Sequence, residues 1–256
     1  MSGDLAAAVV AKSLGDHLVR AYPALLSTES EAMAWARSGA PAGAVVVADY
    51  QASPRGRGGL PWTVQPGRGL GFSLVVRPVL SPEREGWPYV TASLAIADVL
   101  GDGAALDWPD TVVGRIGGRP LARLGVYVEL GPARTNWATV TVLVDDVRPP
   151  RGPLLGRLTD ALELRLADDV DTVLAAYRSR CITLGRQVRA RLIPMGPGGP
   201  EVNGEAVDVL ADGALVVLTA RGHRVAVPPQ NLGLLEAPAI PPELPHDVRR
   251  RLEGES

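Results

Sequence analysis

Residues 49–62 read Asp-Tyr-Gln-Ala-Ser-Pro-Arg-Gly-Arg-Gly-Gly-Leu-Pro-Trp, and the rest of the sequence is interpreted around them. An apolar run at residues 44–48 leads in with strand character, and Arg55 and Arg57 flank a glycine. Glycine lets backbone N–H groups approach an anion closely, and guanidinium groups offer it forked donors. The pattern predicts a loop that closes over a phosphate or carboxylate, with Trp62 as a wall. A solvated Arg/Gly turn has the same composition, and both interpretations stay open.

Composition limits the classes of protein. The chain has 256 residues, 46% of them hydrophobic, which is enough for a substantial core. A net charge of −2 with dispersed arginines argues against a nucleic-acid or membrane-surface role. Cys181 is the only cysteine, so no internal disulfide can form, and the first ten residues lack the charged region of a signal peptide. We therefore expect a cytoplasmic protein without nucleic-acid or membrane partners.

Apolar periodicity and turn residues divide the chain into elements. Pro23 is expected to end the first helix, and Ser27-Thr28 with Glu31 to form a capping box. The β-branched runs after residue 110 suggest antiparallel neighbours. We expect helices at 4–20, 29–38, 86–100, 154–166 and 170–180, and strands at 44–50, 69–77, 112–116, 124–130 and 139–144.

A change of pattern near residue 184 predicts a second, smaller unit. Short strands are expected at 188–193, 206–210, 214–219 and 223–227, which suits a small barrel. The predicted domains are therefore residues 1–183, residues 184–236 and a flexible tail, 237–256.

Several stretches together resemble the biotin–protein ligase family. The resemblance spans roughly residues 25–236 in the family's order. It is carried by Ser27-Thr28, Gly39–Gly43, Val45–Gln51, Arg55-Gly56-Arg57, Trp62, Gly71–Pro78, Trp108-Pro109, Gly125–Glu129, Thr183–Arg189, Gly204–Ala206 and Asp212–Leu215.

The resemblance implies an α+β fold, in which a mixed central sheet flanked by helices, like a class II synthetase, precedes a C-terminal SH3-like barrel. Too few residues precede Ser27 for the N-terminal winged helix that some members carry. ATP, biotin and Mg²⁺ are implied as ligands, a carrier domain as partner, and a homodimer is allowed. The implied ligand-binding residues are Ser27, Thr28, Gln51, Arg55, Gly56, Arg57, Trp62, Trp108 and Gly125, with Arg57 also implied in catalysis.

The chain departs from the family's charged positions. The loop Gly-Arg-Gly-Arg-Arg-Gly-Arg of the family is here residues 54–60, Pro-Arg-Gly-Arg-Gly-Gly-Leu, so half of the positive charge is lost. The lysine of Lys-Trp-Pro-Asn-Asp is Asp107, which puts a carboxylate where an ammonium should meet two anions. Lys12 is the only lysine and cannot replace it from nearby in sequence. Asn of Ser-Thr-Asn is Glu29, and the Asn of a later glycine-rich motif is Asp146.

Three hypotheses follow. The first is a ligase-like pseudoenzyme that binds a small carboxylic acid such as biotin, a carrier domain, or both, with weak or lost ligation. The second is an active ATP-dependent ligase for biotin or another acyl acid, in which Asp107 and Asp110 share Mg²⁺, or Arg115, Arg119 or Arg123 replaces the lysine.

The third hypothesis, acyl transfer through Cys181, has no histidine near it in sequence to support it. The histidines at 17, 223 and 246 show no metal-ligand spacing, and we assign no metal site. Arg186 and Arg189 are further candidates for facing a nucleotide across the junction between the two predicted domains.

Overall fold

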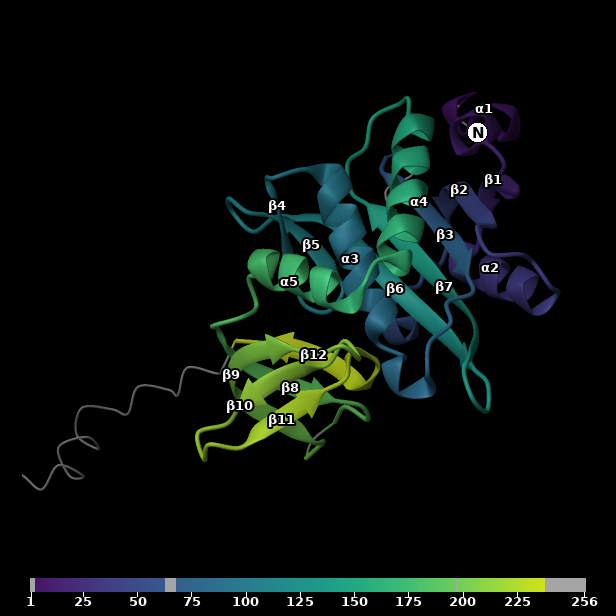
Figure 1. Ribbon diagram of the computed structural model, residues 1–256. Coiled ribbons are helices and arrows are strands. Elements are labelled where there is room, and N and C mark those ends of the chain that lie inside the picture. Colours follow the sequence, from purple (N-terminus) through teal and green to yellow (C-terminus); the bar gives the residue numbers. More distant parts are fainter. Residues whose placement is uncertain (1–2, 63–67, 197, 238–256) are drawn as a thin grey trace, which may run out of the picture.

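The structure is a computed structural model that describes residues 3–62, 68–196 and 198–237. Its centre is a seven-stranded mixed sheet (Figure 1). Neighbouring strands are antiparallel except the first pair, which is parallel. The spatial order is β1 (Val19–Leu25), β2 (Val45–Gln51), β3 (Leu70–Val76), β7 (Thr135–Val144), β6 (Pro120–Leu130), β5 (Thr111–Gly114) and β4 (Ala104–Asp107).

The two faces of this sheet are covered by different helices, as the alternation of strand side chains requires. Val45 and Val47 of β2 belong to the main core with α3 (Trp87–Leu100) and α4 (Gly152–Ala167). Val46 belongs to a smaller core on the opposite face, against α2 (Thr28–Arg37). Figure 1 shows α3 and α4 together on one side of the sheet. The face under α2 also carries the residues 55–62 loop.

The C-terminal part is a small antiparallel barrel-like sheet. Its strand order is β11 (Arg224–Val227), β10 (Leu215–Leu218), β9 (Glu201–Val209), β8 (Gln187–Leu192) and β12 (Leu232–Glu236). It lies beyond α5 (Val170–Arg180) in Figure 1. The expected α+β class, with a mixed sheet followed by a small barrel, is confirmed. The expected boundary at 183/184 stays a prediction, and the expected tail at 238–256 lies outside the described residues.

Some sequence expectations for individual elements are wrong. The first helix, α1 (Ala7–Leu14), ends earlier than predicted, and β1 follows it with Pro23 inside the strand. Proline is tolerated there because β1 is an edge strand. The predicted capping box does not form either. Ser27 is the N-cap of α2 but makes no side-chain cap bond, and Glu31 accepts hydrogen bonds from Arg20 and Tyr22 instead.

A buried arginine fixes the first residue of the 49–62 stretch. Arg151 is 1% exposed at the N-terminus of α4. Its Nη2 donates to Asp49 Oδ1 at 2.7 Å, and its Nε donates to Asp4 Oδ2 at 2.9 Å. Arg151 Nη1 also donates to the carbonyl oxygen of Gly69 at 3.2 Å. This cluster holds together the N-terminus, the end of β2 and the start of β3.

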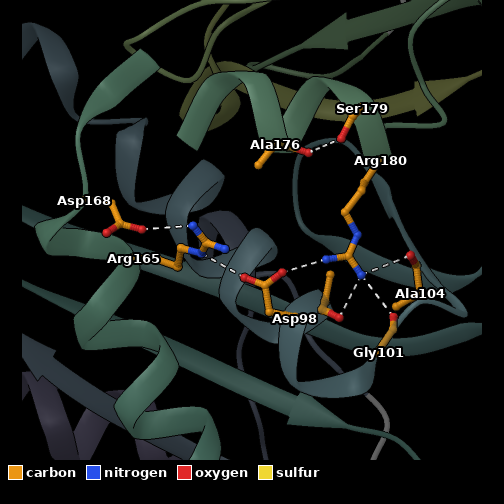
Figure 2. A network of polar contacts seen from close by, with 9 residues as sticks. Asp98, Gly101, Ala104, Arg165, Asp168, Ala176, Ser179 and Arg180 are labelled. Atoms are coloured by element: carbon orange, nitrogen blue, oxygen red, sulfur yellow. Dashed lines mark hydrogen bonds and ion pairs between the residues drawn. The ribbon is translucent and has the colours of Figure 1, made fainter. Parts of the chain in front are cut away.

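A second arginine network joins α5 to the C-terminal end of α3 and to the start of β4 (Figure 2). Arg180 Nη1 donates to Asp98 Oδ1 at 2.7 Å, and Arg165 Nε donates to Asp98 Oδ2 at 2.8 Å. Arg180 Nη2 donates to the carbonyl oxygens of Ala97 and Gly101. Beyond the network, Ile182 N donates to the carbonyl oxygen of Leu106 at 2.8 Å, which brings residue 183 beside residue 107.

Candidate functional site

The residues 55–62 loop is a compact turn with internal hydrogen bonds. Gly56 N donates to the Leu60 carbonyl at 2.9 Å, and Trp62 N donates to the Pro54 carbonyl at 3.0 Å. The exposed Arg55 donates through Nη1 to the carbonyl of Gly59 at 3.0 Å. These hydrogen bonds define the shape of the loop.

Two glycines let this turn lie directly on the sheet. A Cβ atom on Gly125 of β6 would be 2.7 Å from the carbonyl carbon of Gly56. A Cβ atom on Gly56 would be 2.2 Å from the ring of Trp62. Since real Cβ atoms essentially never come this close to other heavy atoms, Gly56 can lie between β6 and the Trp62 ring only because both positions are glycine. Three of the predicted site residues are thus brought together.

Arg57 is directed toward the barrel. Its side chain is 7% exposed, and its Nε donates to Asp110 Oδ2 at 2.8 Å. Nη1 donates to the carbonyl oxygen of Leu232, and Nη2 donates to that of Gly233 at 3.5 Å. The guanidinium that was predicted to face a phosphate instead donates hydrogen bonds to a carboxylate and to carbonyl oxygens of strand β12. Its role toward a ligand stays a prediction.

Asp107 lies in a cavity of about 310 Å³ at the junction with the barrel. Thr183 Oγ1 donates to Asp107 Oδ1 at 2.8 Å and accepts from the backbone N–H of Trp108 at 2.8 Å. Trp108 is buried, and its Nε1 donates to the carbonyl of Gly213 at 3.0 Å. Arg57, Asp110 and Arg186 also line the cavity. The predicted turn at 107–110 is therefore a junction between the sheet and the barrel.

Two predicted residues, Thr28 and Gln51, form a polar floor on the sheet face under α2 together with two residues that were not predicted. Gln51 Oε1 accepts from the backbone N–H of Thr28 at 2.8 Å and from its hydroxyl at 3.1 Å. Ser73 Oγ donates to Thr28 Oγ1 at 3.0 Å and lies 2.8 Å from Thr141 Oγ1. We call these four residues, Thr28, Gln51, Ser73 and Thr141, the polar floor. A Cβ atom on Gly71 of β3 would be 2.4 Å from Gln51 Nε2, so a larger residue at this position would clash with the floor.

Two buried hydroxyls near the floor have no hydrogen-bond partner among the described residues. They are Ser27 Oγ at the start of α2 and Thr139 Oγ1 on β7. A buried hydroxyl without a partner costs about 1–3 kcal/mol.

Glu29, the second residue of α2, is 9% exposed and makes no hydrogen bond or ion pair with any described residue. Burial raises the pKa of its carboxyl, and the electrostatic attraction of Arg55 lowers it in part. The Glu29 charge also acts on the buried Tyr89 hydroxyl, as do Arg57 and Asp110. The Glu29 carboxyl therefore lies within electrostatic range of Arg55 in the loop.

The raised pKa of Glu29 makes stability depend on pH. Because its pKa is higher in the folded than in the unfolded state, its stabilisation is complete below the unfolded value and is lost as pH rises through the folded value. We expect Glu29→Gln to gain stability relative to the unsubstituted protein as pH rises from about 4 to about 7. Urea unfolding of both proteins at the two pH values measures this difference. A difference that does not change with pH would contradict the prediction.

The remaining candidates lie elsewhere. Arg119 pairs with Asp146 at 3.6 Å and Arg123 pairs with Asp145 at 3.1 Å, so neither replaces a lysine beside Asp107. Arg189 pairs with Glu201. Cys181 is buried, with a pKa raised by burial, and His17 bonds Glu163 on the far edge of the sheet.

The described residues contain neither a candidate metal centre nor a membrane-spanning helix. In the described part of the chain, no group of three or more His, Cys, Asp or Glu side chains could hold a metal ion. Within the same ranges, no helix combines the length and apolarity needed to cross a bilayer.

Sequence reasoning missed the residues that support the site. Ser73 and Thr141 complete the floor, and Thr183 links Asp107 to Trp108. Ser73 and Thr183 lie inside stretches that resemble the family, and the alternation of β3 and β7 puts Ser73 and Thr141 opposite one another. Strand alternation was therefore the signal that could have found the floor.

Comparisons with known proteins agree with this fold. The chain is 32% identical over 225 residues to the biotin–[acetyl-CoA-carboxylase] ligase of Mycobacterium tuberculosis, covering 78% of this chain and 83% of that protein. Among solved structures, the biotin protein ligase of Aquifex aeolicus in complex with biotin and ATP has a TM-score of 0.64 at 19% identity, covering 86% of this chain and 99% of that one. A biotin protein ligase-like protein of unknown function from a Silicibacter species has a TM-score of 0.62 at 15% identity, covering 84% and 95%. No protein-family model matches the sequence.

The architecture is that of a biotin ligase catalytic domain followed by a small β-barrel. The chain belongs to the biotin–protein ligase family.

Proposed function

We propose that this chain is a biotin–protein ligase-like pseudoenzyme. It binds a small carboxylic acid such as biotin, a carrier domain, or both, and its ability to ligate is weak or lost. The observation that carries the proposal is the charge of the 107–111 cavity, in which Asp107 stands at the family's lysine position.

The cavity's charges do not suit a nucleotide phosphate. An adenylating site must hold fixed positive charge against the negative charge of the transition state. Here Arg57 already donates to Asp110 and to two carbonyl oxygens of β12, and Asp107 adds a negative charge. Arg186, exposed at the cavity's edge, is the guanidinium for which no partner is found among the described residues. The lining holds two arginines, Arg57 and Arg186, against three carboxylates, those of Asp107, Asp110 and Glu236, so the cavity carries more negative than positive charge.

The polar floor, in contrast, suits a small polar ligand. Its side chains orient one another, and the unpartnered hydroxyls of Ser27 and Thr139 lie near it. Preorganised polar atoms of this kind lower the cost of binding. ATP and biotin are named in the complex of the Aquifex aeolicus relative, and for this chain we retain biotin as the ligand to test first.

An active ATP-dependent ligase is the second candidate. The similarity covers 83% of a protein named as a ligase, and Asp107 and Asp110 line one cavity where carboxylates could share Mg²⁺. Against this candidate, Asp110 is already paired with Arg57 at 2.8 Å.

A single set of assays separates the two candidates. Incubation with ATP, biotin and a biotin carboxyl carrier domain should give no streptavidin-detectable label and no pyrophosphate release, while calorimetry shows that biotin binds. The Aquifex aeolicus ligase serves as the positive control for labelling. Label or pyrophosphate formed at the rate of that control would overturn the proposal in favour of the active ligase. If neither biotin nor a stable biotinyl-adenylate analogue binds, the small-acid proposal fails.

A further inference from the structure

We propose that Glu29 makes this site select a carboxylic acid whose polar head carries a protonated nitrogen, such as an ammonium, amidinium or cyclic guanidinium group. The inference rests on the proposed function, because it names the class of small acid that the site beside the polar floor would take.

The first argument is the lack of a partner for Glu29. Acidic side chains are almost never this buried unless they are paired. Glu29 is 9% exposed, yet no hydrogen bond or ion pair to its carboxyl is found in the described ranges, whereas Glu31 on the same helix is bonded to Arg20 and Tyr22. A ligand cation would supply the partner that the described residues do not.

The second argument is the arrangement of charges around Glu29. Arg55 acts on Glu29 electrostatically without bonding it, and its guanidinium is exposed and donates to the carbonyl of Gly59. Arg57 is neutralised by Asp110. The buried Tyr89 hydroxyl donates to the Val126 carbonyl at 3.2 Å, and burial raises its pKa, so it carries no charge at neutral pH. Within the described ranges, none of these three side chains therefore bonds to Glu29 in competition with a ligand cation.

The third argument is the hydrogen-bond character of the neighbouring atoms. Thr28 already donates both its N–H and its hydroxyl to Gln51, so these donors are not available to a ligand carbonyl. A neutral head can donate an N–H to the Glu29 carboxylate, but its oxygen would meet a second acceptor there. A cationic head donates the same kind of hydrogen bond and adds the attraction between opposite charges. A carboxylate at the other end of such a ligand could meet Arg55.

Biotin and 2-iminobiotin provide a matched pair of probes. They differ only at one position of the ring, where the ureido oxygen of biotin is replaced by an imino nitrogen, so that 2-iminobiotin is a protonated cyclic guanidine at neutral pH. Calorimetry at pH 7 should show 2-iminobiotin binding at least about tenfold more tightly than biotin. Glu29→Gln should bring the two affinities within about threefold of each other.

The matched control is Glu31→Gln, which removes a carboxylate two residues away on the same helix. It should leave the preference for 2-iminobiotin unchanged, and circular dichroism should show that both variants are folded. Equal affinities in the unsubstituted protein, or a preference for biotin, would overturn the role of Glu29 and leave the proposed function standing. Binding of neither probe would overturn the proposed function, and this inference with it.

Discussion

Asp107→Lys should raise the affinity for a stable biotinyl-adenylate analogue by one to three orders of magnitude. Two unit charges about 4 Å apart interact by roughly 4 kcal/mol at an effective dielectric constant near 20, so replacing repulsion by attraction changes the balance by up to about 8 kcal/mol. The Asp107 cavity is open to solvent at one side, and screening reduces this to about 1.4–4 kcal/mol. Calorimetry with the analogue measures the change.

Two variants serve as controls for this prediction. Asp107→Asn removes the repulsion without adding a cation and should give a smaller gain. Asp102→Lys adds the same charge on an exposed turn before β4 and should give none. If Asp107→Lys behaved like Asp102→Lys, the carboxylate of Asp107 would not be what prevents nucleotide binding, and the charge argument for a pseudoenzyme would fail.

Arg57→Ala should lower the free energy of unfolding by about 2–4 kcal/mol, because it leaves Asp110 and two carbonyls of β12 without their donor. At about 2–4 °C per kcal/mol for a chain of this size, the Tm should fall by roughly 5–15 °C. Scanning calorimetry of the two proteins tests this value.

Arg55→Ala is the matched control, since it removes a neighbouring arginine whose side chain is exposed and bonds within its own loop. We expect it to cost less than about 1 kcal/mol. The double variant Arg57→Ala/Asp110→Ala should lose less unfolding free energy than the two single variants lose together, because it leaves neither charge unpaired. Equal losses of unfolding free energy for Arg57→Ala and Arg55→Ala would show that the bonds of Arg57 to β12 do not stabilise the protein.

Local signals predicted the main elements of the fold well. The valine-rich β2 and β3 and the short strands after residue 184 were recognised by period and turn residues. β1 was missed because Pro23 indicates a break, and only its place at the sheet edge makes that proline acceptable. β12 was missed because Gly233 interrupts a strand of five residues.

The site was harder to predict because its side chains are directed by contacts far apart in sequence. Arg57 was expected over a ligand, but its partners include residues 232 and 233 of the barrel. The family resemblance indicated which positions differ, at Glu29 and Asp107. It could not indicate that Glu29 has no partner among the described residues or that Thr183 bonds to Asp107, since both depend on tertiary packing.

The contact of Trp108 with the barrel has a thermodynamic consequence. Trp108 donates to Gly213 from the first part of the chain, Arg84 donates to Ala211, and Arg178 donates to Val209. Each bond satisfies a buried or half-buried group only while the other part is folded, so these bonds couple the stability of the two parts. The change of sequence pattern near residue 184 therefore separates two architectures that are joined by hydrogen bonds.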